Sequence, residues 1–224
     1  MNNSKKFGFT LGEVLLAVLI TGVIAALTIP SVMKDIQQKT RMNLLKGMVG
    51  NFSNVVQSEL TRTRTTEITD TDIHNNPKAF LERFDYNPTG RPFAATYKRY
   101  SDLKAVNGVL IPSNGTENQA VIALKNGVGL GIINYPENRN SAIIIDVNGD
   151  KEPNIIGADY FIFKMEWDDN FEKGYRSGDF SSYENGGSEG TETNEGLKTA
   201  CKDGNGAACF RLVQLTSYEP GYLD

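Results

Sequence analysis

The sequence predicts an α+β fold, in which a long N-terminal helix precedes a head built on an antiparallel β-sheet. Two observations in the 224-residue chain carry this prediction. The N-terminal segment is first apolar throughout and then apolar with a helical period, which indicates one long helix. The later segment contains short runs of β-branched and aromatic residues between turn residues, which indicates strands.

The first part of the predicted helix is an uncharged run from Val14 to Met33. At about 1.5 Å per residue it would be about 30 Å long, which matches the hydrocarbon core of a bilayer. The run is longer than the roughly 7–15 apolar residues of a cleaved secretory signal. Lys5 and Lys6 precede it, and positive charge on this short side predicts that the N-terminus stays in the cytoplasm.

The helix is expected to continue beyond the membrane as an amphipathic segment. Residues 9–33 would span the membrane, residues 34–60 would carry one apolar face, and the whole helix would run from Phe9 to about Leu60. Pro30 lies inside it and should kink or locally open the helix, because proline lacks a backbone donor. The apolar positions of the second part are Ile36, Leu44, Leu45, Met48, Val49, Phe52, Val55, Val56 and Leu60.

One residue conflicts with a simple membrane anchor. Glu13 sits at the upstream edge of the apolar run. An unpaired carboxylate at the centre of a bilayer costs about 2.5–3.5 kcal/mol. The plain interpretation is a glutamate at the level of the lipid headgroups that needs no partner.

The segment "KKFGFTLGEVLLAVLITGVIAALTIP" resembles the N-terminus of type IV pilins and of type II secretion pseudopilins. The matching features are a basic leader, residues 1–8, that ends in Gly8, then Phe9 in the tripeptide FTL, then Glu13 and Pro30. The resemblance covers about the first 30 residues. Gly12 departs from it, because the family usually has an aliphatic residue there.

The resemblance implies processing and assembly. A prepilin peptidase would cut between Gly8 and Phe9 and methylate the new Phe9 amine. Glu13 would then face the N-terminal amine of a neighbouring subunit in a filament, where pairing makes a charge in an apolar bundle tolerable. The implied location is the bacterial cytoplasmic membrane, with the head on its outer side before filament assembly. Lipid, other pilin subunits and an inner-membrane assembly machine with a cytoplasmic ATPase would be the partners.

The function expected from these features is structural, as a subunit of a type IV pilus or a type II secretion pseudopilus. The alternative is a minor or tip pilin whose head binds a surface, DNA or a secreted substrate. The net charge of −4 and the lack of a basic block argue against a dedicated nucleic-acid surface. No nucleophile–base set or phosphate loop is visible, so we expect no enzyme and no required cofactor.

Residues 61–224 are expected to form the head. Residues 61–77 read as a polar loop, and residues 77–84 as a short helix with proline in its first turn. An antiparallel sheet should cover the apolar face of the helix, as in the lollipop-shaped fold of the pilin family. The strand-like runs are 94–100, 108–112, 120–125, 127–135, 141–147 and 159–167, with a hairpin turn at residues 125–127.

The stretch from residue 146 to residue 161 has two interpretations. Asp146, Asn148 and Asp150 alternate as oxygen ligands do in the first half of a calcium loop, and Asp159 is the best additional ligand. The second half does not fit an EF-hand loop, because its twelfth position lacks a carboxylate. The other interpretation is a turn between strands, in which aspartates accept hydrogen bonds from backbone donors.

Two features are expected near the C-terminus. Residues 168–198 are rich in Gly, Ser, Glu and Asn and read as a flexible surface loop. Cys201 and Cys209 are the only cysteines, and in a chain with an export-type N-terminus they favour a disulfide that closes a C-terminal loop. Such a bridge is worth roughly 2.5 kcal/mol by chain entropy. The alternative is a reduced, unpaired state.

Overall fold

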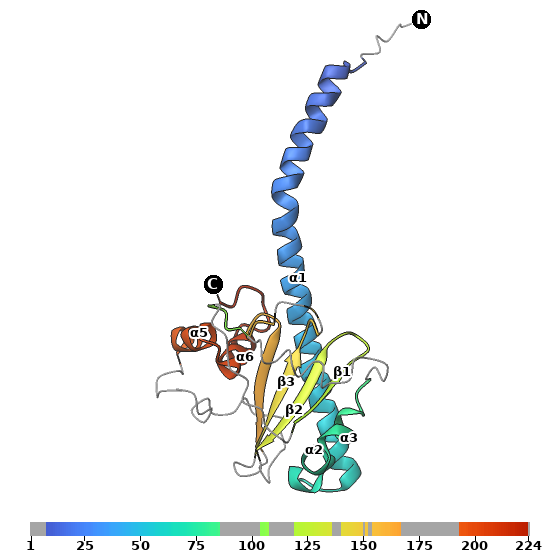
Figure 1. Ribbon diagram of the computed structural model, residues 1–224, viewed down its shortest axis with the longest axis vertical. Helices are drawn as coiled ribbons and strands as arrows, with labels where there is room; N and C mark the ends of the chain where they lie inside the picture. Colours follow the sequence, from blue (N-terminus) through green and yellow to red (C-terminus); the bar gives the residue numbers. More distant parts are fainter. Residues whose placement is uncertain are drawn as a thin grey trace, which may run out of the picture. The chain divides into compact units, whose positions relative to one another are not determined.

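The computed structural model has the predicted α+β arrangement, a long N-terminal helix and a four-stranded antiparallel sheet (Figure 1). It describes residues 8–85, 104–107, 119–135, 140–149, 151, 154–166 and 193–223. The chain divides into two units, residues up to Thr40 and residues from Arg41 onward. The described elements are α1 (Leu11–Thr63), η1 (Ile68–Asp70), α2 (Asp72–Asn75), α3 (Pro77–Leu81), β1 (Gln119–Ala123), β2 (Gly129–Tyr135), β3 (Asn140–Asp146), β4 (Tyr160–Glu166), α5 (Asn194–Lys202) and α6 (Gly206–Leu215).

Helix α1 starts two residues later and ends three residues later than the sequence predicts. Its last turn closes when the Thr65 N–H donates to the Leu60 carbonyl at 3.2 Å, with Arg64 in the left-handed region at φ 56°. The helix is continuous through Pro30, so it does not end or open there, and the predicted kink stays a prediction. One missing donor is tolerated because the neighbouring i→i−4 bonds hold the helix on both sides.

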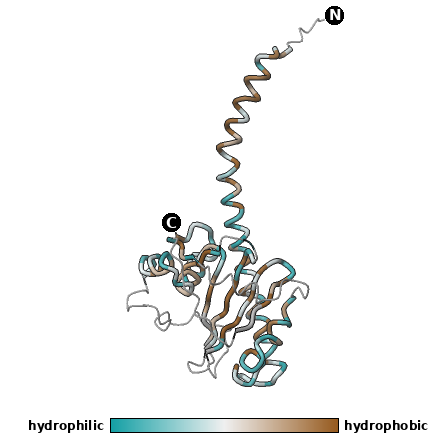
Figure 2. Tube along the Cα trace, viewed as in Figure 1, coloured by the Kyte–Doolittle hydropathy of each residue, from teal (hydrophilic) through white to brown (hydrophobic). Residues whose placement is uncertain are grey.

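The first unit exposes its apolar side chains. Phe9 is 87% exposed, and every large apolar residue from Leu11 to Met33 is exposed by about half or more. Figure 2 shows this stretch of α1 as a nearly continuous hydrophobic segment. The helix is long and apolar enough to cross a membrane, by length and composition.

The second unit has a core between α1 and the sheet. Strand order is β1-β2-β3-β4, with each neighbouring pair antiparallel. Residues paired across the strands share a face, and one face carries the rows Leu130–Ile145–Phe161 and Ile132–Ile143–Phe163. The Phe163 ring meets Phe52 of α1 edge-on at 5.6 Å, so α1 covers this face. The buried positions of α1 are Met42, Leu45, Met48, Val49, Phe52, Val56, Glu59 and Leu60.

Local sequence signals account for most of the smaller elements. The predicted hairpin turn joins β1 and β2, where Gly127 has φ 85° and donates to the Leu124 carbonyl at 3.0 Å. The predicted short helix is α3, which has Pro77 in its first turn and the Asn76 side chain as its N-cap. Residues 61–77, expected to be a loop, contain η1 and α2. The strand-like runs 94–100 and 108–112 lie outside the described residues.

The end of the predicted flexible loop is helical. The sequence predicts a loop over residues 168–198, but α5 begins at Asn194. Thr193 caps this helix by accepting the Gly196 N–H at 3.1 Å. Residues 168–192 of the predicted loop lie outside the described residues. Buried Leu197 anchors α5, which composition alone did not indicate because Gly, Glu and Asn dominate the segment.

A buried glutamate near the end of α1 organises the segment that follows. Glu59 is 1% exposed and accepts from Arg62 Nη2 at 2.9 Å and from the Asp72 N–H at 3.0 Å. Arg83 forms ion pairs with both Glu59 and Asp72, and Arg62 also reaches Asp72 at 3.0 Å. Two carboxylates and two guanidinium groups therefore compensate one another. The network connects the end of α1 to Asp72, the first residue of α2, and to Arg83, which follows α3.

We predict that Glu59→Gln destabilises the second unit by about 2 kcal/mol, because a neutral amide replaces the buried carboxylate that accepts from Arg62, Arg83 and the Asp72 N–H. The measurement is chemical unfolding of the full chain in detergent micelles. Glu67→Gln, which changes an exposed carboxylate just before η1, is the control and should shift stability by about 0.5 kcal/mol or less. Equal effects of the two variants would contradict the proposed contribution of the Glu59 network to the free energy of unfolding.

Candidate functional site

The predicted processing site lies in exposed, non-helical backbone. Gly8, Phe9 and Thr10 precede the first residue of α1 and are all exposed. Nothing lies within 4 Å of a Cβ built at Gly8. A peptide bond between Gly8 and Phe9 is therefore open on the surface of the chain, as sites of proteolytic cleavage commonly are.

Glu13 has partners within its own chain, a role that the sequence analysis did not assign. Its Oε2 accepts the Thr10 backbone N–H at 2.8 Å and the Thr10 hydroxyl at 2.9 Å, and the Glu13 N–H donates to Thr10 Oγ1 at 3.2 Å. These reciprocal bonds form a capping box, which satisfies donors that the start of a helix leaves open. The spacing T-x-x-E before an apolar run is the sequence signal that would have found it.

The capping box leaves Glu13 able to accept further bonds. Both Thr10 bonds go to Oε2, and an ionised carboxylate has a second oxygen with its own lone pairs. The side chain is exposed and lies at the very start of α1. The negative charge is also favoured there by the positive end of the helix dipole.

The stretch predicted to be either a calcium loop or a turn has the bonding of a turn in its described part. Asp146 Oδ1 accepts the N–H groups of Asn148 and Gly149 at 3.2 and 2.9 Å. Asp159 Oδ1 accepts the Ile155 N–H at 2.6 Å, and its Oδ2 accepts the amide of Asn148 at 2.9 Å. The carboxylates therefore serve as acceptors for backbone and amide donors.

In this turn the Asn148 NH₂ group donates to Asp159 Oδ2. Among the described residues, no group of three or more His, Cys, Asp and Glu side chains is placed to hold a metal. Asp150 lies outside the described residues. Calcium binding therefore stays a prediction from the sequence.

Asp159 is an ionisable group buried under the C-terminal tail. It is fully buried, and burial raises its pKa from the ordinary value of 3.8 to about 6, against the opposing effects of the Ile155 bond, the charge of Arg41 and the Asn148 bond. The folded protein therefore binds this proton more tightly than the unfolded chain does. As a result, Asp159 makes stability fall as pH rises through the window from about 4 to about 6.

We predict that Asp159→Asn flattens this pH dependence. The wild-type chain should lose at most about 3 kcal/mol of unfolding free energy between pH 4 and pH 7 through this group, and the variant should lose less. Chemical unfolding of the full chain at pH 4, 5, 6 and 7 measures the difference. Glu219→Gln, an exposed carboxylate of the same tail, should keep the wild-type slope. An unchanged slope in Asp159→Asn would contradict the raised pKa.

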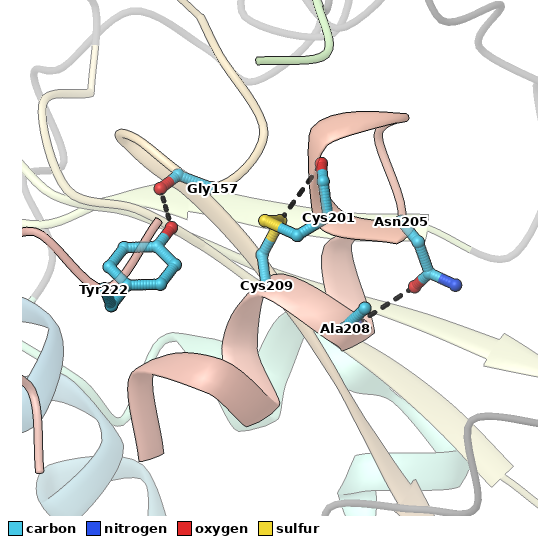
Figure 3. The surroundings of a disulfide bond; sticks show 6 residues. All are labelled: Gly157, Cys201, Asn205, Ala208, Cys209 and Tyr222. Carbon is cyan, nitrogen blue, oxygen red and sulfur yellow. Dashed lines mark hydrogen bonds between the residues drawn. A yellow bond between two sulfur atoms is a disulfide. The ribbon is translucent and has the colours of Figure 1, made fainter. Parts of the chain in front are cut away.

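The expected disulfide is present, and it has a structural setting that the sequence did not show. Cys201 near the end of α5 and Cys209 in α6 are joined, with Cα atoms 4.7 Å apart. The bridge closes the C-terminal segment that the sequence predicts, and it links two helices. Tyr222 donates from its hydroxyl to the Gly157 carbonyl beside the bridge (Figure 3). Burial raises the pKa of this phenol well above its ordinary range, so it remains a donor.

The predicted site residues fall into separate places. Gly8, Phe9, Glu13 and Pro30 belong to the first unit, whereas Asp146, Asn148, Asp159 and the two cysteines belong to the second. In the second unit Asn148 contacts both Asp146 and Asp159, and the two cysteines lie beside Gly157 of the same turn. The chain matches no protein-family model, no curated protein and no solved structure.

Proposed function

We propose that this chain is a pilin-like structural subunit that a prepilin peptidase processes and that assembles into a filament through α1. The filament would be a type IV pilus or a type II secretion pseudopilus. The observation that carries the proposal is the exposed apolar first part of α1, which begins with a carboxylate directly after an accessible Gly8–Phe9 bond. A long apolar helix followed by a small antiparallel sheet is compatible with pilin architecture.

The exposed apolar side chains of α1 require apolar surroundings that the chain itself does not provide. Large apolar side chains exposed along this much of a helix require lipid or another apolar helix around them. Before assembly the partner would be the lipid of the bacterial cytoplasmic membrane, with the N-terminus in the cytoplasm. After assembly it would be the corresponding helices of other subunits, drawn from the membrane by machinery that a cytoplasmic ATPase drives.

Cleavage would give Glu13 a new partner. Cutting after Gly8 removes residues 1–8 and creates an amine on Phe9, which the peptidase would methylate. The Glu13 carboxylate keeps an oxygen for such an amine on a neighbouring subunit, while Thr10 continues to hold the other oxygen. Pairing would lower the cost of this charge inside an apolar bundle.

The processing prediction is tested by intact mass and N-terminal sequence. Chain purified from cells that contain a prepilin peptidase should begin at N-methylated Phe9. Gly8→Ala should remain uncut, because the peptidase of this family requires glycine before the scissile bond. A native chain that begins at Met1, or that is cut after Ala26 as a secretory signal would be, contradicts the proposal.

A second experiment tests the role of Glu13 in filament assembly independently of cleavage. Glu13→Ala should be cut like the wild type but incorporated into filaments at a level lower by roughly tenfold or more, which corresponds to the loss of one charge-assisted contact. Immunoblots of sheared filament fractions and of membranes measure both quantities. Asp35→Ala, which removes an exposed carboxylate farther along α1, is the control and should assemble normally. Normal incorporation of Glu13→Ala would refute the pairing with an amine.

A further inference from the structure

The disulfide is packed against a glycine whose missing side chain leaves room for the two sulfur atoms. Gly157 lies in the turn between β3 and β4 and has φ 88°. A Cβ built on it would lie 2.7 Å from Cys209 Sγ, 3.0 Å from Cys201 Sγ and 3.1 Å from the Tyr222 hydroxyl. Real Cβ atoms do not approach this closely, so backbone and bridge are in direct contact at this place.

The turn that carries Gly157 is held firmly. The Gly157 N–H donates to the Tyr160 carbonyl at 2.9 Å, and the Ala158 N–H donates to the Ile155 carbonyl at 3.0 Å. Asp159 Oδ1 accepts the Ile155 N–H, and the Tyr222 hydroxyl donates to the Gly157 carbonyl. The backbone therefore has little freedom to move away from the sulfur atoms.

The bridge is also adjacent in the chain to an aromatic contact through which α6 packs on the sheet. Phe210 follows Cys209 directly in the chain, and its ring stacks on Phe163 of β4 at 4.8 Å. Both cysteines are fully buried. A displacement of Cys209 would therefore act on the residue next to the one that stacks on β4.

We propose that disulfide formation is the step that allows α5, α6 and the C-terminal tail to dock on the β3–β4 turn, so that the second unit is completed only after oxidation. Bonded sulfur atoms are about 2.05 Å apart, whereas two thiols must remain at non-bonded separation. Both sulfur atoms are fully buried, and they lie so close to Gly157 that a Cβ there would come within 3.0 Å of each. The reduced chain must therefore displace the turn or the helices.

The redox step is a thiol–disulfide exchange with a disulfide-bearing protein oxidant. One cysteine thiolate attacks a sulfur of the oxidant and forms a mixed disulfide. The second thiolate displaces the oxidant, which leaves as a dithiol. The chain loses two electrons and two protons, and the oxidant gains them. This inference concerns folding of the second unit and does not depend on the proposed filament.

Hydrogen exchange of the full chain in detergent micelles tests the proposal. Because the bridge is buried, the reduced chain is prepared by unfolding and refolding in excess reductant. We expect amides of residues 154–160 and 206–223 to exchange faster by roughly tenfold or more in the reduced wild type than in the oxidised one. Amides of β3 provide the internal reference.

The double variant Cys201→Ala/Cys209→Ala distinguishes steric crowding by two thiols from loss of the covalent link. It lacks the bond, but two methyl groups need less room than two thiols. We expect it to keep protection within about threefold of the oxidised wild type, in oxidant and in reductant alike. If it loses as much protection as the reduced wild type, the bridge acts only as a tether, and the proposal is overturned. Full protection in the reduced wild type overturns it as well.

Gly157→Ala gives a second test with a matched control. Its methyl group would lie within 3.0 Å of both sulfur atoms, so oxidised Gly157→Ala should lose protection in residues 206–223. Gly127→Ala has the same backbone strain, at φ 85°, but nothing lies within 4 Å of its new Cβ. Gly127→Ala should keep the protection of residues 206–223. Equal losses in the two variants would show that backbone strain, and not contact with the bridge, causes the effect.

Discussion

The second unit depends on the apolar stripe of α1, and above all on Phe52. Its ring lies 6.1 Å from Phe80, 6.0 Å from Phe84 and 5.6 Å from Phe163, so one side chain joins α3, the segment after it and β4. Aromatic rings bury large areas and prefer such edge-on and offset arrangements. The stripe narrows the choice of fold, because a helix with one apolar face requires a cover, and the sheet provides it.

The same helix poses a different problem before Lys34. From Val14 to Met33 it carries no charge and is apolar on every side, and the described residues of the first unit bury none of its large apolar side chains. Burial against the chain's own sheet satisfies a stripe, but it cannot satisfy a helix that is apolar all round. This difference in pattern along one backbone is the reason that the proposed function involves lipid and other subunits.

Three carboxylates show three ways of accommodating a negative charge. Glu13 stays exposed and is bound by the first turn of the helix that it caps. Glu59 is buried, and two arginines compensate its charge. Asp159 is buried with backbone and amide donors around it, and its raised pKa reflects the weaker compensation. Burial and the partners within reach, and not residue type, set the behaviour of each.

The sequence by itself determined the helix, four strands, the hairpin turn and the pairing of the cysteines, because periodicity and turn chemistry are local and the cysteines had no alternative partner. The Thr10–Glu13 cap also has a local sequence signal, the T-x-x-E spacing. Only the tertiary structure decided that Glu59 meets Arg83, that Gly157 abuts the bridge and that α5 starts within the predicted loop. These features join residues far apart in the chain or depend on one buried side chain, and no local pattern encodes such contacts.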